Sequence, residues 1–176
     1  MNVLITIILL ALLTLPVSAQ TTLTGGIGYN VASAREELLQ NKPQKLSAQL
    51  ISKHLRDENF SENMNYLLKG HAELKDRTLA MFSDGTYAVM LHQDKFHVWY
   101  YSKSGNLLYA EEKDGLDYPY KSYKYNTNGK LINMGLRVSK GETFIYTPEG
   151  KLIAHWINSN GYDENGNIIM TRKYAE

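Results

Sequence analysis

The chain contains no cysteine among its 176 residues. Disulfides, thiolate zinc sites, cysteine nucleophiles and a lipid-modified amino-terminal cysteine are therefore excluded. The chain also has almost no net charge, because 19 basic and 18 acidic residues leave a formal charge of +1. This balance provides no long-range field that would attract nucleic acid, so we expect no nucleic-acid partner.

Charge is also missing from the side chains of the first twenty residues. These residues run apolar from Val3 to Leu15, break at Pro16 and end in small residues at Ala19. Such a pattern is typical of a secretory signal peptide that is cleaved after Ala19. As a helix, the apolar run would span roughly 20 Å, short of the roughly 30 Å core of a bilayer. We therefore predict a signal peptide over residues 1–19, a secreted or periplasmic protein, and no stable membrane anchor after cleavage.

The rest of the chain divides by composition. Residues 20–30 are polar and rich in glycine, which predicts a linker. Residues 31–176 predict one domain, because a chain of this size buries a sufficient core without crosslinks. Within it, residues 31–70 carry helical patterns and residues 71–176 carry the alternating pattern of β-strands. The fold class predicted is α+β, with short amino-terminal helices packed on an antiparallel β-meander.

The helical part contains three short amphipathic segments. Ser33, with Glu36 three residues later, predicts a capping box at the start of the first. The second covers residues 45–57, with apolar residues at helical spacing. The third is predicted to begin after Ser61 and to end at Gly70 in the left-handed conformation. Helices this short are marginal in water, so we expect them to dock on the sheet.

The β part contains all but two of the 13 tyrosines, the exceptions being Tyr29 and Tyr66. Its clearest alternation of apolar and polar residues lies in residues 131–138. Because side chains of a strand alternate between faces, we predict that Ile132 and Met134 point to the same, buried face.

A motif recurs four times in the β part: tyrosine, three residues, glycine, a polar residue and two aliphatic residues. We predict that each copy closes a β-hairpin, with the glycine in the left-handed conformation and the tyrosine ending the incoming strand. A related glycine turn is predicted at Gly85. The meander would then consist of glycine-turn hairpin repeats. The copies place Tyr101 with Gly105, Tyr125 with Gly129, Tyr146 with Gly150, and Tyr162 with Gly166.

These copies resemble the repeats of the MORN family and of antitoxin-like repeat proteins, and more distantly the tyrosine-aspartate (YD) repeats of large bacterial surface and toxin proteins. The resemblance covers about residues 80–174 and implies a single-layer or wrapped antiparallel sheet that mediates binding. The chain departs from these families in its irregular spacing, in the absence of the second glycine and tryptophan-bearing strand of MORN repeats, and in its helical amino-terminal part.

A metal site is one candidate for chemistry. His92, His97 and Asp94 would suit a site of two histidines and one carboxylate. Their spacing matches no established motif, and the turn between them would have to aim both rings to one face. We therefore expect neither a metal nor a cofactor.

A carboxylate pair is the second candidate, because Glu111, Glu112 and Asp114 could supply the acids of a glycosidase. Consecutive residues of a strand face opposite sides, and the nearby Gly115 and Pro119 favour a solvated loop. We predict a protein without catalytic activity, with hydrolysis by this acidic loop as the alternative.

The stretch "DYPYKSYKY" interleaves tyrosines with lysines, and flat rings beside hydrogen-bond donors suit a sugar or a peptide. We predict an exported, non-catalytic binding module that recognises an envelope protein or glycan through a tyrosine-rich surface. The alternative is a periplasmic carrier of an apolar ligand in a curved half-barrel, because strands such as "KLIAHWIN" are apolar on both faces. The predicted binding residues are Tyr118, Tyr120, Lys121, Tyr123 and Lys124.

Overall fold

The structure is a computed structural model that describes residues 28–40 and 42–171. The predicted signal peptide and most of the predicted linker lie outside these ranges. The described residues form three helices followed by ten strands, and every strand pairs antiparallel with the next one along the chain. An antiparallel meander accompanied by a few short helices is therefore confirmed. None of the described helices is long and apolar enough to cross a membrane.

The helices are α1 (Val31–Leu39), α2 (Ala48–Ser52) and α3 (Phe60–Leu68). The first five strands are β1 (Arg77–Met81), β2 (Tyr87–Leu91), β3 (Asp94–Tyr101), β4 (Leu107–Lys113) and β5 (Tyr120–Asn126). The other five are β6 (Leu131–Arg137), β7 (Glu142–Tyr146), β8 (Leu152–Ile157), β9 (Asn160–Tyr162) and β10 (Ile168–Thr171).

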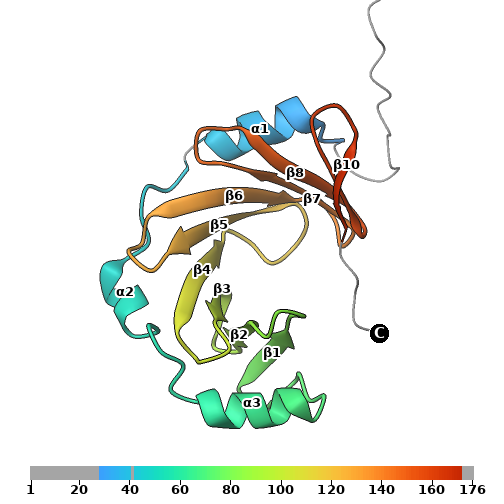
Figure 1. Cartoon of the computed structure of the whole chain (residues 1–176). Helices are drawn as coiled ribbons and strands as arrows, with labels where there is room; N and C mark the ends of the chain where they lie inside the picture. The colour runs from blue at the N-terminus through green and yellow to red at the C-terminus, as the bar shows by residue number, and fades with distance from the viewer. Residues whose placement is uncertain (1–27, 41, 172–176) are drawn as a thin grey trace, which may run out of the picture.

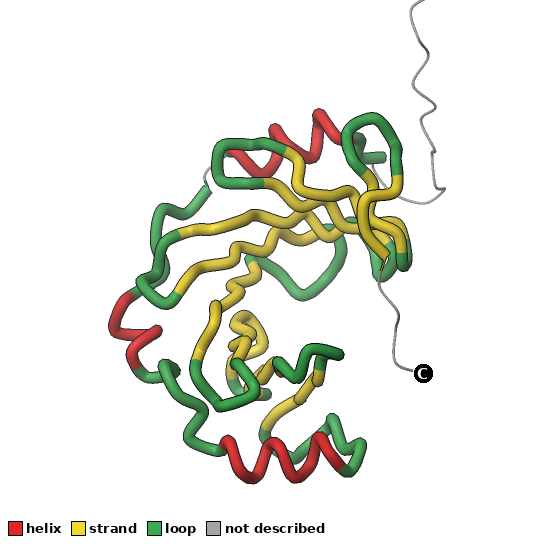
Figure 2. The backbone as a smooth tube through the Cα atoms, in the orientation of Figure 1, coloured by secondary structure: helices red, strands yellow, loops and turns green. Residues whose placement is uncertain are grey.

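The sheet is strongly curved and forms a C in Figure 1. Figures 1 and 2 show the helices on its outer, convex side, where α1 lies against β6, β7 and β8, and α3 lies against β1. In the described part of the chain no helix covers the inner, concave face. The two faces of the sheet therefore have different roles.

The hydrophobic core lies between the convex face and the helices. Ala34 and Leu38 of α1 are buried in it, together with Leu46 and Ile51. The sheet contributes large side chains from alternate positions, which cover the face that the helices close. The main ones are Leu79, Tyr87, Trp99, Tyr101, Tyr125, Met134, Phe144 and Tyr146.

Five turns between consecutive strands share one backbone arrangement. A glycine in each has a positive φ between 77° and 87°, and its N–H donates to the carbonyl three residues earlier. In the β5–β6 turn, for example, Gly129 N donates to Asn126 O at 2.9 Å, and the Asn126 side chain accepts from Lys130 N at 3.0 Å. A small polar residue occupies the Asn126 position in three other turns as Ser102, Thr147 and Asp163, each accepting the same bond.

The segment that carries the first two helices and leads into the third, residues 30–40 and 42–60, runs along three of these turns, those of Gly105, Gly129 and Gly150, and we call it the strap (Figure 1). Leu46 N donates to Gly129 O at 3.0 Å, and Asp57 N donates to Gly105 O at 2.9 Å. The approach is so close that a Cβ on Gly129 would lie 2.5 Å from the carbonyl oxygen of Leu46. These hydrogen bonds attach the strap, on the convex side of the sheet, to the turns at the ends of the hairpins.

The start of α1 differs from the prediction. The helix begins at Val31, and its N-cap is Asn30 rather than Ser33. Asn30 Oδ1 accepts from Ser33 N at 2.9 Å, while Ser33 Oγ accepts from Asn30 N at 3.0 Å. Asparagine caps as well as serine does, and this earlier start directs Leu38 into the core.

The start of α3 also differs, because the helix begins at Phe60 with Asn59 in the N-cap position, rather than after Ser61. The ring of Phe60 lies against Gly105, where a Cβ would meet it at 2.9 Å, and this contact holds the first turn on the sheet. The predicted left-handed residue at the end of the helix is confirmed, since Gly70 has a φ of 75°.

The second predicted helix is much shorter than residues 45–57. It covers only the residues of α2, because Leu46 before it is hydrogen-bonded to the β5–β6 turn, and Arg56 after it forms an isolated bridge with Asn106. Backbone pairing with the sheet has replaced helical hydrogen bonds at both ends.

A β-bulge changes the predicted face of one residue in β6. Leu131 pairs with Tyr125 and Asn133 pairs with Lys124, so Ile132 is the extra residue between them. Met134 is fully buried as predicted, whereas Ile132 is 38% exposed and Leu131 takes the buried place. An alternating pattern does not show such an inserted residue.

Candidate functional site

The strand register brings a group of charged and aromatic side chains together on the concave face. Trp99, Ala110 and Tyr125 face the core, so their neighbours in β3, β4 and β5 face the other way. The register then aligns pairs of these neighbours on adjacent strands. The pairs are Tyr100 with Tyr109, Glu111 with Lys124, and Tyr120 with Arg137. With Lys113 on the same face of β4, these seven residues form what we call the concave-face cluster.

Stacked rings form one half of the cluster. The rings of Tyr100 and Tyr109 lie 4.5 Å apart between centroids, and Lys124 Nζ lies 4.2 Å from the Tyr109 centroid. Tyr118, in the loop between β4 and β5, stacks on Tyr120 at 5.6 Å. Tyr118 is 46% exposed, so its ring is open to solvent.

The charged side chains of the cluster are held apart. Tyr100 Oη donates to Glu111 Oε2 at 3.0 Å, and Arg137 Nη1 donates to Tyr120 Oη at 3.3 Å. The Nε of Arg137 is buried and has no hydrogen-bond partner among the described residues. In the same part of the chain, no carboxylate lies within ion-pair distance of the cations of the cluster. The cluster therefore holds three cations and one carboxylate that do not neutralise one another directly.

Burial shifts the pKa values of the lysines and tyrosines of the cluster toward their neutral forms. It lowers the pKa of Lys124 and of Lys113, with Glu111 opposing it in both cases. Burial also raises the pKa of Tyr100 and Tyr109, so both phenols stay protonated, and Tyr100 donates to Glu111. The two ammonium groups have lost part of their hydration, and an anion placed beside them would restore favourable interactions.

The five predicted binding residues do not share one surface. Tyr120 and Lys124 lie on the concave face, and Tyr118 stacks beside them. Lys121 and Tyr123 point to the convex side, where Lys121 forms an ion pair with Glu37 of α1 at 2.7 Å. Tyr120 and Tyr123 are only 8% and 6% exposed. Alternation along β5 separates the five residues, so a common surface made by all of them is not present.

Five residues of the cluster were not among the predicted binding residues: Tyr100, Tyr109, Glu111, Lys113 and Arg137. Each comes from β3, β4 or β6 and reaches the site only through the pairing register. Alternation alone could have shown that Tyr100 faces away from Trp99. It could not have shown that Lys124 lies over the same rings.

The prediction of a solvated acidic loop is wrong for Glu111 and Glu112, which lie inside β4, and alternation along the strand separates them. Glu111 lies on the concave face, whereas Glu112 points to the convex side and accepts from Tyr125 Oη at 2.9 Å. Asp94 and Glu112 lie on either side of His97: Asp94 Oδ2 is 2.9 Å from Nδ1, and Glu112 Oε1 is 3.7 Å from Nε2. The His97 ring occupies the space between these two acids, which leaves no room there for a glycosidic bond. The two carboxylates together raise the pKa of His97 against the effect of burial.

The residues of the hypothetical metal site also have separate partners. His92 Nε2 lies 3.1 Å from Thr78 Oγ1, and its Nδ1 lies 3.1 Å from Lys75 O. His97 contacts Asp94 instead. Within the described ranges, no group of three histidine, aspartate or glutamate side chains is arranged to hold a metal ion.

A hollow of about 350 Å³ opens on the convex side near the end of β4. It contains two predicted binding residues, Lys121 and Tyr123, together with Asp114. Lys121 is paired with Glu37, and Asp114 accepts from Lys121 N at 2.6 Å. Since these polar groups already have partners, the hollow offers less to a ligand than the concave-face cluster does.

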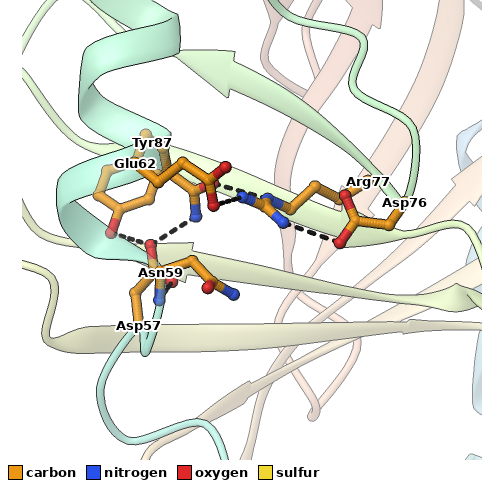
Figure 3. A network of polar contacts seen from close by, with 7 residues as sticks. Asp57, Asn59, Glu62, Asp76, Arg77 and Tyr87 are labelled. Atoms are coloured by element: carbon orange, nitrogen blue, oxygen red, sulfur yellow. Dashed lines mark hydrogen bonds and ion pairs between the residues drawn. The ribbon is translucent and has the colours of Figure 1, made fainter.

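A second polar network joins α3 to β1 (Figure 3). Arg77, which is 5% exposed, donates from Nε to Asn63 Oδ1 at 2.7 Å. Its Nη1 donates to Asp76 at 2.8 Å, and its Nη2 donates to Glu62 at 2.6 Å. Asn63 is fully buried. The guanidinium therefore has a partner on each nitrogen.

The same network continues to β2 through Asp57. Asp57 Oδ2 accepts from Asn63 Nδ2 at 2.8 Å and from Tyr87 Oη at 2.6 Å (Figure 3). Burial raises the pKa of Tyr87, and Asp57 raises it further, so the phenol stays a donor. Because its members satisfy one another, we interpret this network as structural and the concave-face cluster as the candidate site.

Comparison with family models, with curated proteins and with solved structures finds no match to this chain.

Proposed function

We propose that this chain is an exported, non-catalytic binding module that recognises an envelope protein or glycan through the tyrosine-rich concave face of its sheet. The observation that carries the proposal is the concave-face cluster, in which stacked rings and unneutralised cations lie on the face without helices. Rings with a polar edge bind both apolar and hydrogen-bonding surfaces, and they lose little conformational entropy. The apolar, uncharged segment of residues 1–19 supports export.

We also propose that the sheet is built from a repeated hairpin unit, similar to the MORN-like, antitoxin-like and YD repeats. The equal hydrogen bonds at five glycine turns support this unit. In this proposal the tyrosines of the first three motifs belong to the scaffold, because Tyr101, Tyr125 and Tyr146 are buried on the convex side, whereas Tyr162 is only half-buried. The binding residues are instead the aromatic and charged side chains between the motifs, such as Tyr100 and Lys124.

Replacing Tyr118 with alanine tests the binding face. The ring is 46% exposed and lies in a loop, so we expect the melting temperature to change by only a few degrees. Capture of the envelope partner from a membrane or cell-wall extract should fall at least about tenfold, because the ring is the exposed end of the stacked tyrosines.

The matched control is Leu68→Ala on α3, which removes a side chain that is 76% exposed on the convex side. It should leave capture unchanged. If Tyr118→Ala captures the partner as well as the unchanged protein does, or if both variants lose capture equally, the concave face is not the binding surface.

The curvature of the sheet favours a second candidate function, a carrier that holds an apolar ligand in a half-barrel (Figure 1). The four charged side chains of the concave-face cluster weigh against a purely apolar ligand, because covering them with hydrocarbon would remove their hydration. A carrier purified from its own membrane fraction would show co-purifying lipid in native mass spectrometry. We expect the mass of the protein alone, and a bound lipid would favour the carrier.

A further inference from the structure

We infer that the ligand of the concave face is an acidic saccharide, whose anionic group lies among Lys113, Lys124 and Arg137 and whose ring lies against the tyrosines. This inference rests on the proposed function and names the chemical class of ligand for the same face. It follows from three features of the site: an excess of positive charge, a carboxylate with capacity for further donors, and stacked tyrosine rings that end in the exposed ring of Tyr118.

The first feature is the excess of positive charge. The whole chain has a formal charge of only +1, yet this face collects three cations around one carboxylate. Lys121, which alternates onto the opposite face of the same strand, has a carboxylate partner at 2.7 Å, whereas Lys124 has none within ion-pair distance among the described residues. The guanidinium of Arg137 likewise keeps a buried Nε without a partner in the described chain. An anionic group beside Lys124 and the terminal nitrogens of Arg137 would supply the ion-pair partner that these cations lack.

The second feature is Glu111, which pairs with Lys124 across the strands and lies two residues from Lys113 in β4. One of its oxygens accepts from Tyr100, and a carboxylate has capacity for several further donors. A ligand with negative charge alone would be repelled by Glu111. A ligand that carries hydroxyl groups beside its anionic group can donate to Glu111 while the anion lies on the cations. Sugars with an acidic substituent combine these two groups within one ring.

The third feature is the arrangement of rings. Tyr118 stacks on Tyr120 and is 46% exposed, so its ring offers a flat surface beside the charged groups, while Tyr100 and Tyr109 stack on each other under Lys124. A sugar ring has an apolar face of C–H groups that can lie on such a surface, with its hydroxyls at the edge. An acyl chain would instead cover the charges and remove their hydration.

The test compares two probes by isothermal titration calorimetry: a galacturonic acid oligosaccharide and the galactose oligosaccharide of the same length. We expect the acidic probe to bind at least about tenfold more tightly, and the difference to shrink at high salt. Lys124→Met keeps the apolar stem and removes the charge, so it should weaken binding of the acidic probe about tenfold. Lys121→Met, on the opposite face of the same strand, should bind as the unchanged protein does.

Lys113→Met is the second variant and guards against a folding defect at the half-buried Lys124. It should weaken binding of the acidic probe in the same direction while its circular dichroism spectrum stays unchanged. Equal affinity for the two probes would overturn the inference. So would binding of an acidic peptide or of anionic lipid vesicles that depends on Lys124 while the acidic sugar does not bind. In each of these cases loss of capture by Tyr118→Ala would still support the proposed function, whereas unchanged capture would overturn that function itself.

Discussion

Arg77→Ala should lower the free energy of unfolding by about 3 kcal/mol. The substitution leaves the fully buried Asn63 without the donor to its carbonyl oxygen, and it opens a cavity between α3 and β1. The ion pairs add less, because the side chains of Glu62 and Asp76 are 54% and 64% exposed and are screened by water. The loss should appear as a lower midpoint in urea denaturation.

Two further variants separate the causes. Arg77→Met keeps much of the volume and removes the donors, so its loss should be smaller than that of Arg77→Ala but clearly measurable. Arg56→Ala, at an exposed arginine nearby, should change stability by less than about 0.5 kcal/mol. If Arg77→Met is as stable as the unchanged protein, the hydrogen bonds in Figure 3 contribute nothing to the attachment of α3.

Gly129→Ala should also cost about 3 kcal/mol, for two reasons that add. A side chain at a φ of 77° costs about 1 to 2 kcal/mol, because its Cβ crowds the carbonyl. The new Cβ would also lie 2.5 Å from Leu46 O, so the strap has to move away and its hydrogen bond to Gly129 O is lost. A buried bond of this kind adds roughly 1 to 2 kcal/mol.

Gly166→Ala provides the matched comparison for this prediction. Its φ is 81°, but nothing lies within 4 Å of a Cβ at that position. The substitution should therefore cost only the backbone strain of about 1 to 2 kcal/mol. Thermal or urea unfolding of the two variants measures the difference. If the two variants lose the same free energy of unfolding, the strap can move away from residue 129 without destabilising the protein, and its close contact does not require glycine there.

The meander could be predicted because its signals are local. The hydrogen bonds of the β5–β6 turn join residues from Asn126 to Lys130, so five consecutive residues determine the turn. The small polar residue at the Asn126 position accepts one of these bonds and can be recognised in the sequence. The helix starts were harder, because contacts with the sheet moved them, as the docking of Phe60 on Gly105 shows.

The candidate site could be predicted only in part. The composition of residues 117–125 predicted binding residues in the segment that forms β5. Alternation assigns Lys121 and Lys124 of this strand to opposite faces. Which of these faces is covered depends on where the strap docks, far away in the sequence. The meeting of Arg137 with Tyr120 depends on the register between β5 and β6, which the extra residue Ile132 shifts.

The position of the strap has a consequence for the order in which the protein folds. Each hairpin closes through contacts between near neighbours, but the strap must wait for hairpins far downstream. The Tyr146 hydroxyl donates to Val31 O across 115 residues, and Lys42 donates to Pro148 O across 106. Contacts this distant form slowly, because a long loop has to close first. The part of the polypeptide that is synthesised early is therefore the part that we expect to become ordered last.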